Sequence, residues 1–422
     1  MDLQNKKLLV LGGTSYYPYI RDYANKKGFV IYSAGKSDNE MIRTYSDKFF
    51  CADAIDVDAI SALVEREEIH GIAALGNEDI IDRVIDVSKR CKIPFYIERG
   101  HWENLQNKQN FKRHCREFGI DVVEEYSVTE QSTDAELQAL PYPIVLKPTD
   151  SCGSKGITVC KDASEVRAAM EKAKSFSRGK HFIAEQYMVR PEFIVTLMIK
   201  DGNIQVWMLG DRHMNTQQEG FGGISQISVF PSRYSDLYMN TVHPKMLKLL
   251  DKYGPENGTF FVQAFIDGDK IRCFDPGLRF CGTLDTILYE PIMGINPLHW
   301  MINHSLTGVM DDADEMSKMD FMLDNKVAAQ LSLHIQTGTI AKIRGLNRIE
   351  KLDSVICMVP LLEEGDTVNM AGTLQQVLAR VYFVADSRED IERMAHEFYD
   401  MVSVTGTDGR ELLMPFVLDY EI

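Results

Sequence analysis

The apolar and polar positions of the first hundred residues fall into short, regularly alternating segments. Continuous apolar runs at 7–11, 29–32 and 71–75 are typical of strands buried on both faces of a sheet. The segments up to residue 27, at 57–67 and at 80–89 indicate helices between them, and 93–96 closes the unit. Strands alternating with helices through short connections predict a doubly wound parallel sheet over residues 1–100.

The middle of the chain has a different pattern. A helix begins near Asn107 and ends near Gly119, and a hairpin follows, with strands at 143–147 and 157–159. A helix at 163–175 leads to strands at 181–185 and 194–199. Residues 200–300 have the pattern of antiparallel strands, with turn signals at 201–203, 222–223 and 267–269. The polar stretch at 311–318 is the expected linker to the next unit.

The last part of the chain has the pattern of a small α+β unit. We expect strands at 338–342, 354–359, 379–385 and 413–418 and a helix at 388–400. The pattern therefore predicts three units: one at 1–100, one that extends to the linker, and one that begins near residue 330.

Composition narrows the class of protein. With 45% apolar and 26% charged residues in 422, the chain has the make-up of a soluble globular protein. A net charge of −16 argues against nucleic acid or an anionic membrane as a partner. The apolar run at 8–11 is too short for a signal or membrane segment, and the eight cysteines form no C-x-x-C pair. We expect a cytoplasmic protein with reduced thiols and, because the histidines show no zinc spacing, no zinc centre.

The hairpin at 143–159 carries the first chemical signal. Its first strand ends in Lys147, and the loop that follows contains Gly153, Lys155 and Gly156. Glycines let backbone N–H groups approach an anion, and two lysines add positive charge in an acidic chain. The spacing excludes a Walker loop, and a hairpin without a ligand is the plain alternative.

Two turns of the first unit could also bind a ligand. Residues 12–14 read Gly-Gly-Thr after a strand, but G-x-G-x-x-G is absent, so a tight turn is favoured over a nicotinamide site. Residues 76–79 follow another strand at the edge where parallel sheets bind ligands, and they could equally be a helix cap.

Further motifs follow in a fixed order along the chain: Asn107-Lys108, Lys147, Ser151 to Gly156, Glu185 to Met188, Glu192, Gln263, and Asp275 with Arg279. In this order and spacing the chain resembles the ATP-grasp ligases, in particular the branch of carbamoyl-phosphate synthase, biotin carboxylase and L-amino-acid ligase. The resemblance covers the first 330 residues or so and, less closely, the rest. It implies an α/β ATP-grasp fold with three domains. These are a doubly wound pre-ATP-grasp domain (1–100), a two-lobed ATP-binding α+β domain (101–325) whose small lobe is at about 112–187, and a small α+β domain like that of biotin carboxylase (326–422).

The resemblance assigns roles around a nucleotide. Lys108 and Lys147 match the two lysines that bind ATP phosphates, and Ser151, Gly153, Ser154 and Gly156 lie in the stretch that matches the glycine-rich loop closing over them. Glu185 would accept from the adenine amino group, and Gln186, Tyr187 and Met188 form the hinge whose backbone contacts the ring. Glu192 would bind the ribose hydroxyls.

It also assigns the metal and the catalytic groups. Gln263 and Asp275, twelve residues apart on predicted paired strands, match the ligands of Mg²⁺ (or Mn²⁺ in its place), which prefers hard oxygen ligands. Arg279 matches the arginine that steadies the phosphoryl and acyl-phosphate charge, and with Lys147 it is the expected catalytic pair. Each acid or amide taken alone could instead be an ordinary surface or core residue.

The expected function is an ATP- and Mg²⁺-dependent carboxylate–amine ligase that works through an acyl phosphate and releases ADP and phosphate. Its partners would be a small carboxylate and an amine, and homodimers are common among similar enzymes. Substrates are expected at 76–79, 211–213, 222–225 and 280–285, with Cys152 and Cys281 as packing residues. One departure stands out: the family commonly reads Glu-x-Asn-x-Arg where this chain has Asp275, Gly277 and Arg279. A nucleotide-binding protein without turnover is therefore the alternative.

Overall fold

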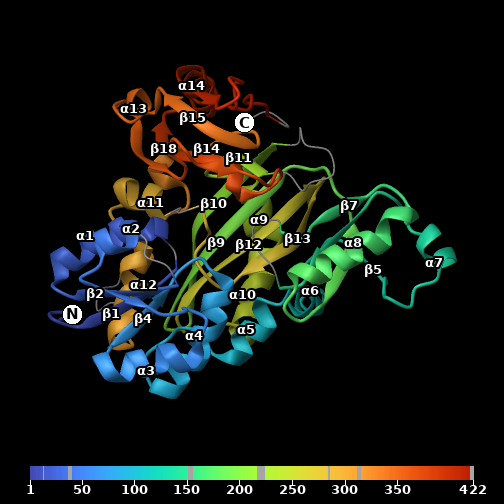
Figure 1. Cartoon of the computed structure of the whole chain (residues 1–422). Coiled ribbons are helices and arrows are strands. Elements are labelled where there is room, and N and C mark those ends of the chain that lie inside the picture. The colour runs from blue at the N-terminus through green and yellow to red at the C-terminus, as the bar shows by residue number, and fades with distance from the viewer. Residues whose placement is uncertain are drawn as a thin grey trace.

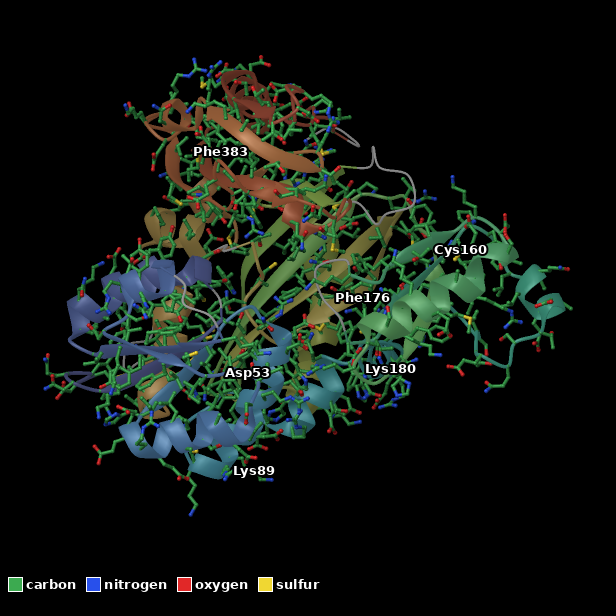
Figure 2. The ribbon with its side chains drawn as sticks, viewed as in Figure 1. Asp53, Lys89, Cys160, Phe176, Lys180 and Phe383 are labelled. Carbon is green, nitrogen blue, oxygen red and sulfur yellow. The ribbon has the colours of Figure 1, made fainter. Side chains whose placement is uncertain are left out.

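The computed structural model describes residues 1–12, 14–36, 40–150, 155–215, 224–283, 286–310 and 315–418. Figure 1 shows three regions around a long central sheet: the N-terminal unit at the lower left, a small lobe at the right, and the C-terminal unit at the top. In Figure 2, Cys160 lies in the small lobe and Phe383 in the C-terminal unit, far apart in the molecule.

The N-terminal unit is a parallel sheet in the order β3-β2-β1-β4, flanked by helices. The predicted doubly wound unit is confirmed, but residues 93–96 form no strand, and the sheet contains a strand that the sequence pattern did not predict, β3 at Lys48–Cys51. Pro94 cannot donate to a sheet ladder, and Tyr96 is instead buried, its hydroxyl donating to the carbonyl of Leu278 at 3.3 Å. The elements are β1 (Lys7–Leu11), α1 (Tyr17–Lys27), β2 (Val30–Gly35), α2 (Glu40–Tyr45), β3 (Lys48–Cys51), α3 (Val57–Glu67), β4 (Gly71–Ala74) and α4 (Glu78–Cys91).

The small lobe is a four-stranded sheet in the order β5-β8-β6-β7 with α8 packed on it. The predicted hairpin is present, since β6 pairs antiparallel with β7. Two helices lead into the lobe, and Asn107 caps the second by accepting from Gln109 and Asn110. The elements are α5 (Arg99–Leu105), α6 (Lys108–Glu117), β5 (Glu125–Tyr126), α7 (Asp134–Gln138), β6 (Ile144–Pro148), β7 (Thr158–Cys160), α8 (Ala163–Phe176) and β8 (Phe182–Gln186).

The central sheet has eight strands in the order β13-β12-β9-β10-β11-β14-β18-β16. The predicted antiparallel strands are confirmed, but 200–310 also contains four helices that the turn signals did not reveal. Their apolar residues repeat with the helical period, as at Met246, Leu249 and Leu250. The elements are β9 (Glu192–Lys200), β10 (Asn203–Asn215), β11 (Ile224–Phe230), α9 (Ser235–Thr241), α10 (His243–Tyr253), β12 (Gly258–Asp267), β13 (Lys270–Gly277), α11 (Thr286–Met293) and α12 (Pro297–Thr307).

The C-terminal unit shares the central sheet. Strands β14 and β18 continue it from β11, and a second sheet, β17-β15-β19, and helix α14 enclose the remaining core. Three predicted strands and the helix are confirmed, whereas 413–418 forms only a single bridge, from Leu413 to Ile335. The elements are β14 (Val327–His334), β15 (Gly338–Arg344), α13 (Leu346–Ile349), β16 (Val355–Pro360), β17 (Thr367–Val368), β18 (Val377–Ala385), α14 (Arg388–Met401) and β19 (Ser403–Gly406), with short 3₁₀ turns at Thr14–Tyr16, Met316–Lys318, Leu323–Asn325 and Leu374–Gln376.

Candidate active site

A buried ionic cluster joins helix α6 to the hairpin of the small lobe. The carboxylate of Glu185 lies between two lysines: its Oε1 accepts from Lys112, and its Oε2 lies 2.8 Å from Nζ of Lys147. Lys112 and Glu185 are almost completely buried. Strands β6 and β8 are neighbours, with Val145 opposite Glu185, so the sheet itself brings Lys147 to the acid.

Burial and charge act in opposite directions in this cluster. Burial alone would raise the pKa of Glu185, but the charges of Lys147 and Lys112 outweigh it and bring the pKa below the ordinary value. Burial lowers the pKa of Lys112, although Glu185 opposes that change. Because each carboxylate oxygen already has a lysine partner, Glu185 organises the two lysines, and its expected contact with adenine stays a prediction.

Lys108 lies beside Asp275, one of the two expected metal ligands. Gln263 and Asp275 are directly opposite each other on β12 and β13, so both side chains lie on one face of the sheet, as the sequence predicted. Nζ of Lys108 lies 2.7 Å from Oδ1 of Asp275. Burial alone would raise the pKa of Asp275, but Lys108 and then Lys147 outweigh it and lower the pKa.

These two side chains fit a hard cation. A carboxylate and an amide oxygen on one face are ligands that Mg²⁺ accepts, with water or phosphate oxygens completing its shell. The carboxylate of Asp275 already stabilises one positive charge, the ammonium of Lys108. Among the described residues, no group of three or more His, Cys, Asp or Glu could hold a metal ion, so a cation here depends on other oxygen ligands as well.

The ion pair of Asp275 should be visible in the acid stability of the protein. Because folding lowers its pKa, ionised Asp275 stabilises the fold fully above its ordinary value of 3.8, and this stabilisation is lost as pH falls through the lower folded-state value. In metal-free buffer, the urea unfolding free energies of wild type and Asp275→Asn should therefore converge between about pH 6 and about pH 2. A difference in unfolding free energy that stays the same at every pH would contradict this ion pair.

Arg279 follows β13 and points to the N-terminal unit. Its Nη2 and Nε lie 2.7 and 3.2 Å from Oε1 of Glu78, and its Nη1 donates to the carbonyl of Phe280 at 2.9 Å. Both Arg279 and Glu78 are buried, and Glu78 begins helix α4, which Asn77 caps. The predicted 76–79 segment thus contributes an acid directly beside the expected catalytic arginine.

The hinge segment follows strand β8. Gln186 donates through its backbone to Glu124 at 3.0 Å, and Tyr187 and Met188 are partly exposed. Glu192 lies at the start of β9, where Nη1 of Arg212 lies 2.5 Å from its Oε2. The expected contacts with a base and a ribose stay predictions.

The glycine-rich loop is described only at its end. Ser151, Cys152, Gly153 and Ser154 lie outside the described residues. Gly156 has a φ of +78°, and a Cβ there would lie 2.8 Å from Cβ of Phe176 and from Cγ of Pro148. Glycine is therefore required at 156, where the loop returns to the lobe against the residue labelled Phe176 in Figure 2.

The expectation that residues 211–213 contact substrate is wrong for Asp211. This side chain is fully buried and accepts from the Ser232 hydroxyl at 2.5 Å and from Arg388 of helix α14 at 2.9 Å. It joins the central sheet to the C-terminal unit. Of the other expected substrate segments, 222–223 and 284–285 lie outside the described residues.

The loop after Arg279 is held by both the N-terminal and the C-terminal unit of the chain. The hydroxyl of Tyr16 donates to the carbonyl of Cys281 at 3.0 Å, Arg380 donates to that of Gly282, and the hydroxyl of Tyr382 donates to that of Thr283 at 2.8 Å. The N-terminal and C-terminal units therefore both fix the backbone next to the expected catalytic arginine. Cys281 is buried, as expected for a packing residue.

A cavity of about 170 Å³ lies beside this arrangement, between the N-terminal unit and the base of the glycine-rich loop. Glu78 lines it on one side and Thr149 and Asp150 on the other. Arg178 also lines the cavity, and its Nη1 lies 3.0 Å from Oδ2 of Asp82. The cavity is thus open to the acid that holds Arg279.

The sequence analysis missed two charged groups of this site. Lys112 is four residues after Lys108 on the same helix, and that spacing alone places both on one face. Glu78 was included only as part of a range, because an acid in the first turn of a helix is usually explained by the helix dipole.

Part of the chain matches a known family of proteins. Residues 107–249 match the family model of the carbamoyl-phosphate synthase L chain, ATP binding domain. The ATP-grasp enzyme fsqD of Aspergillus fumigatus is 27% identical over 132 residues, which are 31% of this chain and 23% of that protein. The chain thus spans less than a quarter of the length of that relative.

Two solved structures extend the likeness to almost the whole chain. The L-amino acid ligase from Bacillus licheniformis superposes with a TM-score of 0.79 at 17% identity, covering 96% of this chain and 99% of that one. The biotin carboxylase domain of Hydrogenobacter thermophilus 2-oxoglutarate carboxylase, solved with MgADP and bicarbonate, gives 0.73 at 15% identity, covering 97% and 91%. The chain has the ATP-grasp fold, and the family match is confined to its residues 107–249. No helix in the described part of the chain has the length and hydrophobicity needed to cross a membrane.

Proposed function

We propose that this protein is an ATP- and Mg²⁺-dependent ligase that joins a carboxylate to an amine through an acyl phosphate. The observation that carries the proposal is the arrangement of Lys108, Lys147 and Lys112 around two acids, buried Glu185 and partly buried Asp275, in an acidic chain of this fold. A triphosphate needs such concentrated positive charge, and phosphoryl transfer asks a protein mainly for positioning and charge stabilisation.

The residues take the following parts. Lys108 and Lys147 bind phosphates, and Gln263 and Asp275 hold the magnesium ion, which neutralises phosphate charge when bound. Arg279 holds the substrate carboxylate as it attacks the γ-phosphate, and the glycine-rich loop excludes water from the acyl phosphate. An amine then displaces phosphate, forming the amide.

The three proposed units share this work. Residues 101–325 bind the nucleotide, 1–100 supply Glu78, and 326–422 supply Arg380 and Tyr382, which fix the loop after Arg279. The partners we propose are small molecules, a carboxylate and an amine, with a homodimer as the assembly to test by light scattering.

The decisive experiment is a phosphate-release screen. Purified protein with ATP and Mg²⁺ is offered pools of amino acids and metabolite carboxylates, and ADP and phosphate are measured. Stimulated release that requires one carboxylate and one amine, with an amide product by mass spectrometry, supports the proposal. Tight ATP binding with no release in any pool would instead support the alternative, a nucleotide-binding protein without turnover.

Replacing Lys147 should weaken nucleotide binding. Lys147→Ala removes one charge-assisted phosphate contact, worth about 1.5–3 kcal/mol, and Kd for ATP should rise about 10-fold to 100-fold. Glu185 keeps Lys112, so the lobe should stay folded. Isothermal titration calorimetry measures the change. Exposed Lys172 of α8 is the matched control, and unchanged ATP affinity in Lys147→Ala would place the triphosphate elsewhere.

A further inference from the structure

One face of strands β12 and β13 carries four side-chain positions next to the proposed nucleotide site. Phe261 is opposite Gly277, and Gln263 is opposite Asp275, with no register shift between the two pairs. Because side chains two apart on a strand share a face, all four positions line the same surface. Only Gln263 and Asp275 among them offer oxygen atoms to a cation.

The Phe261 ring fills the space that a side chain at 277 would need. A Cβ at Gly277 would lie 2.1 Å from Cε1 and 2.3 Å from Cζ of that ring, far inside van der Waals contact. Phe261 is almost completely buried, and because protein interiors are closely packed, moving its ring would displace its neighbours. Residue 277 can therefore contribute no ligand while Phe261 is present.

The ring of Phe261 also packs against Arg279, the proposed catalytic arginine. The guanidinium carbon of Arg279 lies 5.0 Å from the centroid of the Phe261 ring, within the range of a cation–π contact. Two contacts to Glu78 hold the guanidinium in this position. A fixed positive charge thus lies beyond Gly277, where it would repel a second divalent ion.

We infer that Phe261 limits this site to one divalent cation, held by Gln263 and Asp275, and positions Arg279 as the second positive centre. The inference rests on the ATP-dependent function proposed above and specifies its metal requirement. It explains the glycine at 277, where similar sequences commonly have asparagine. The ring of Phe261 occupies the space of the asparagine ligand, and the guanidinium of Arg279 supplies the positive charge of the second metal ion.

The test counts metal ions, independently of turnover. Mn²⁺ is titrated into the protein with one equivalent of a non-hydrolysable ATP analogue, and bound Mn²⁺ is measured by electron paramagnetic resonance. Wild type should bind one Mn²⁺ per nucleotide-loaded chain. Two would overturn the inference while leaving the proposed function standing. Failure to bind the analogue would overturn the proposed function and the inference with it.

Variants test the part played by the ring. The double variant Phe261→Ala with Gly277→Asn makes space and adds an amide oxygen, and it should bind two Mn²⁺. Gly282→Asn is the matched control, because a Cβ at Gly282 meets no atom within 4 Å; it should bind one. Thermal unfolding checks that each variant is folded. If the folded double variant still binds one Mn²⁺, the ring does not set the number of metal ions.

Discussion

Glu185→Gln should loosen the small lobe by about 3–5 kcal/mol, because it leaves two buried ammonium groups without their counter-ion. In the folded chain each carboxylate oxygen of Glu185 pairs with one lysine, and both of these lysines, Lys112 and Lys147, are buried. Hydrogen exchange followed by mass spectrometry should show protection of β6 and β8 reduced by about 10²-fold to 5 × 10³-fold, the equivalent of that free energy. The central sheet should keep its protection.

A control within the same lobe separates this cluster from ordinary surface ion pairs. Glu125 on β5 pairs with Arg116, but both side chains are more exposed, and Glu125→Gln should cost less than about 1 kcal/mol. Adding Lys112→Met to Glu185→Gln should restore part of the protection, because it removes one of the unpaired charges. Equal effects of the two glutamine variants would show that the buried cluster contributes nothing special.

The N-terminal sheet and the order of the site motifs could be predicted from the sequence because they depend on local signals. Buried parallel strands read as continuous apolar runs, and β1 and β4 were placed correctly on that basis. The turn at 267–269 predicts that Gln263 and Asp275 lie on paired strands, but a bulge between Gln263 and Ala264, which the turn does not reveal, brings the two residues directly opposite each other.

Long-range contacts could not be predicted in this way. The pairing of Glu78 with Arg279 joins residues 201 positions apart, and the Asp211–Arg388 contact joins residues 177 apart. The sequence places Asp211 among the expected substrate contacts, and only the fold shows that Ser232 and Arg388 bind its carboxylate. From the sequence, Gly277 indicates a missing metal ligand. The structure shows that the ring of Phe261 on β12 occupies the space that a side chain at 277 would need.

Arg279→Lys should reduce turnover by about 10²-fold to 10³-fold while Kd for ATP changes by less than about threefold. The substitution keeps the charge but loses the planar guanidinium, which makes two contacts to Glu78 and one to Phe280. The nucleotide phosphates are assigned to Lys108 and Lys147, which have other partners, so nucleotide affinity should be nearly unaffected.

A lysine substitution is the sharper test because Arg279→Ala would also leave Glu78 buried without a partner. Arg272→Lys is the control: Arg272 lies on β13, the strand that precedes Arg279, and pairs with Asp267 at 2.8 Å near the hairpin turn, so this variant should leave turnover unchanged. The measurements are ATP affinity by calorimetry and steady-state ADP release with the substrate pair identified in the screen. If Arg279→Lys lost affinity and turnover equally, the arginine would be a nucleotide-binding group, and the carboxylate would have to be held by another residue near Glu78.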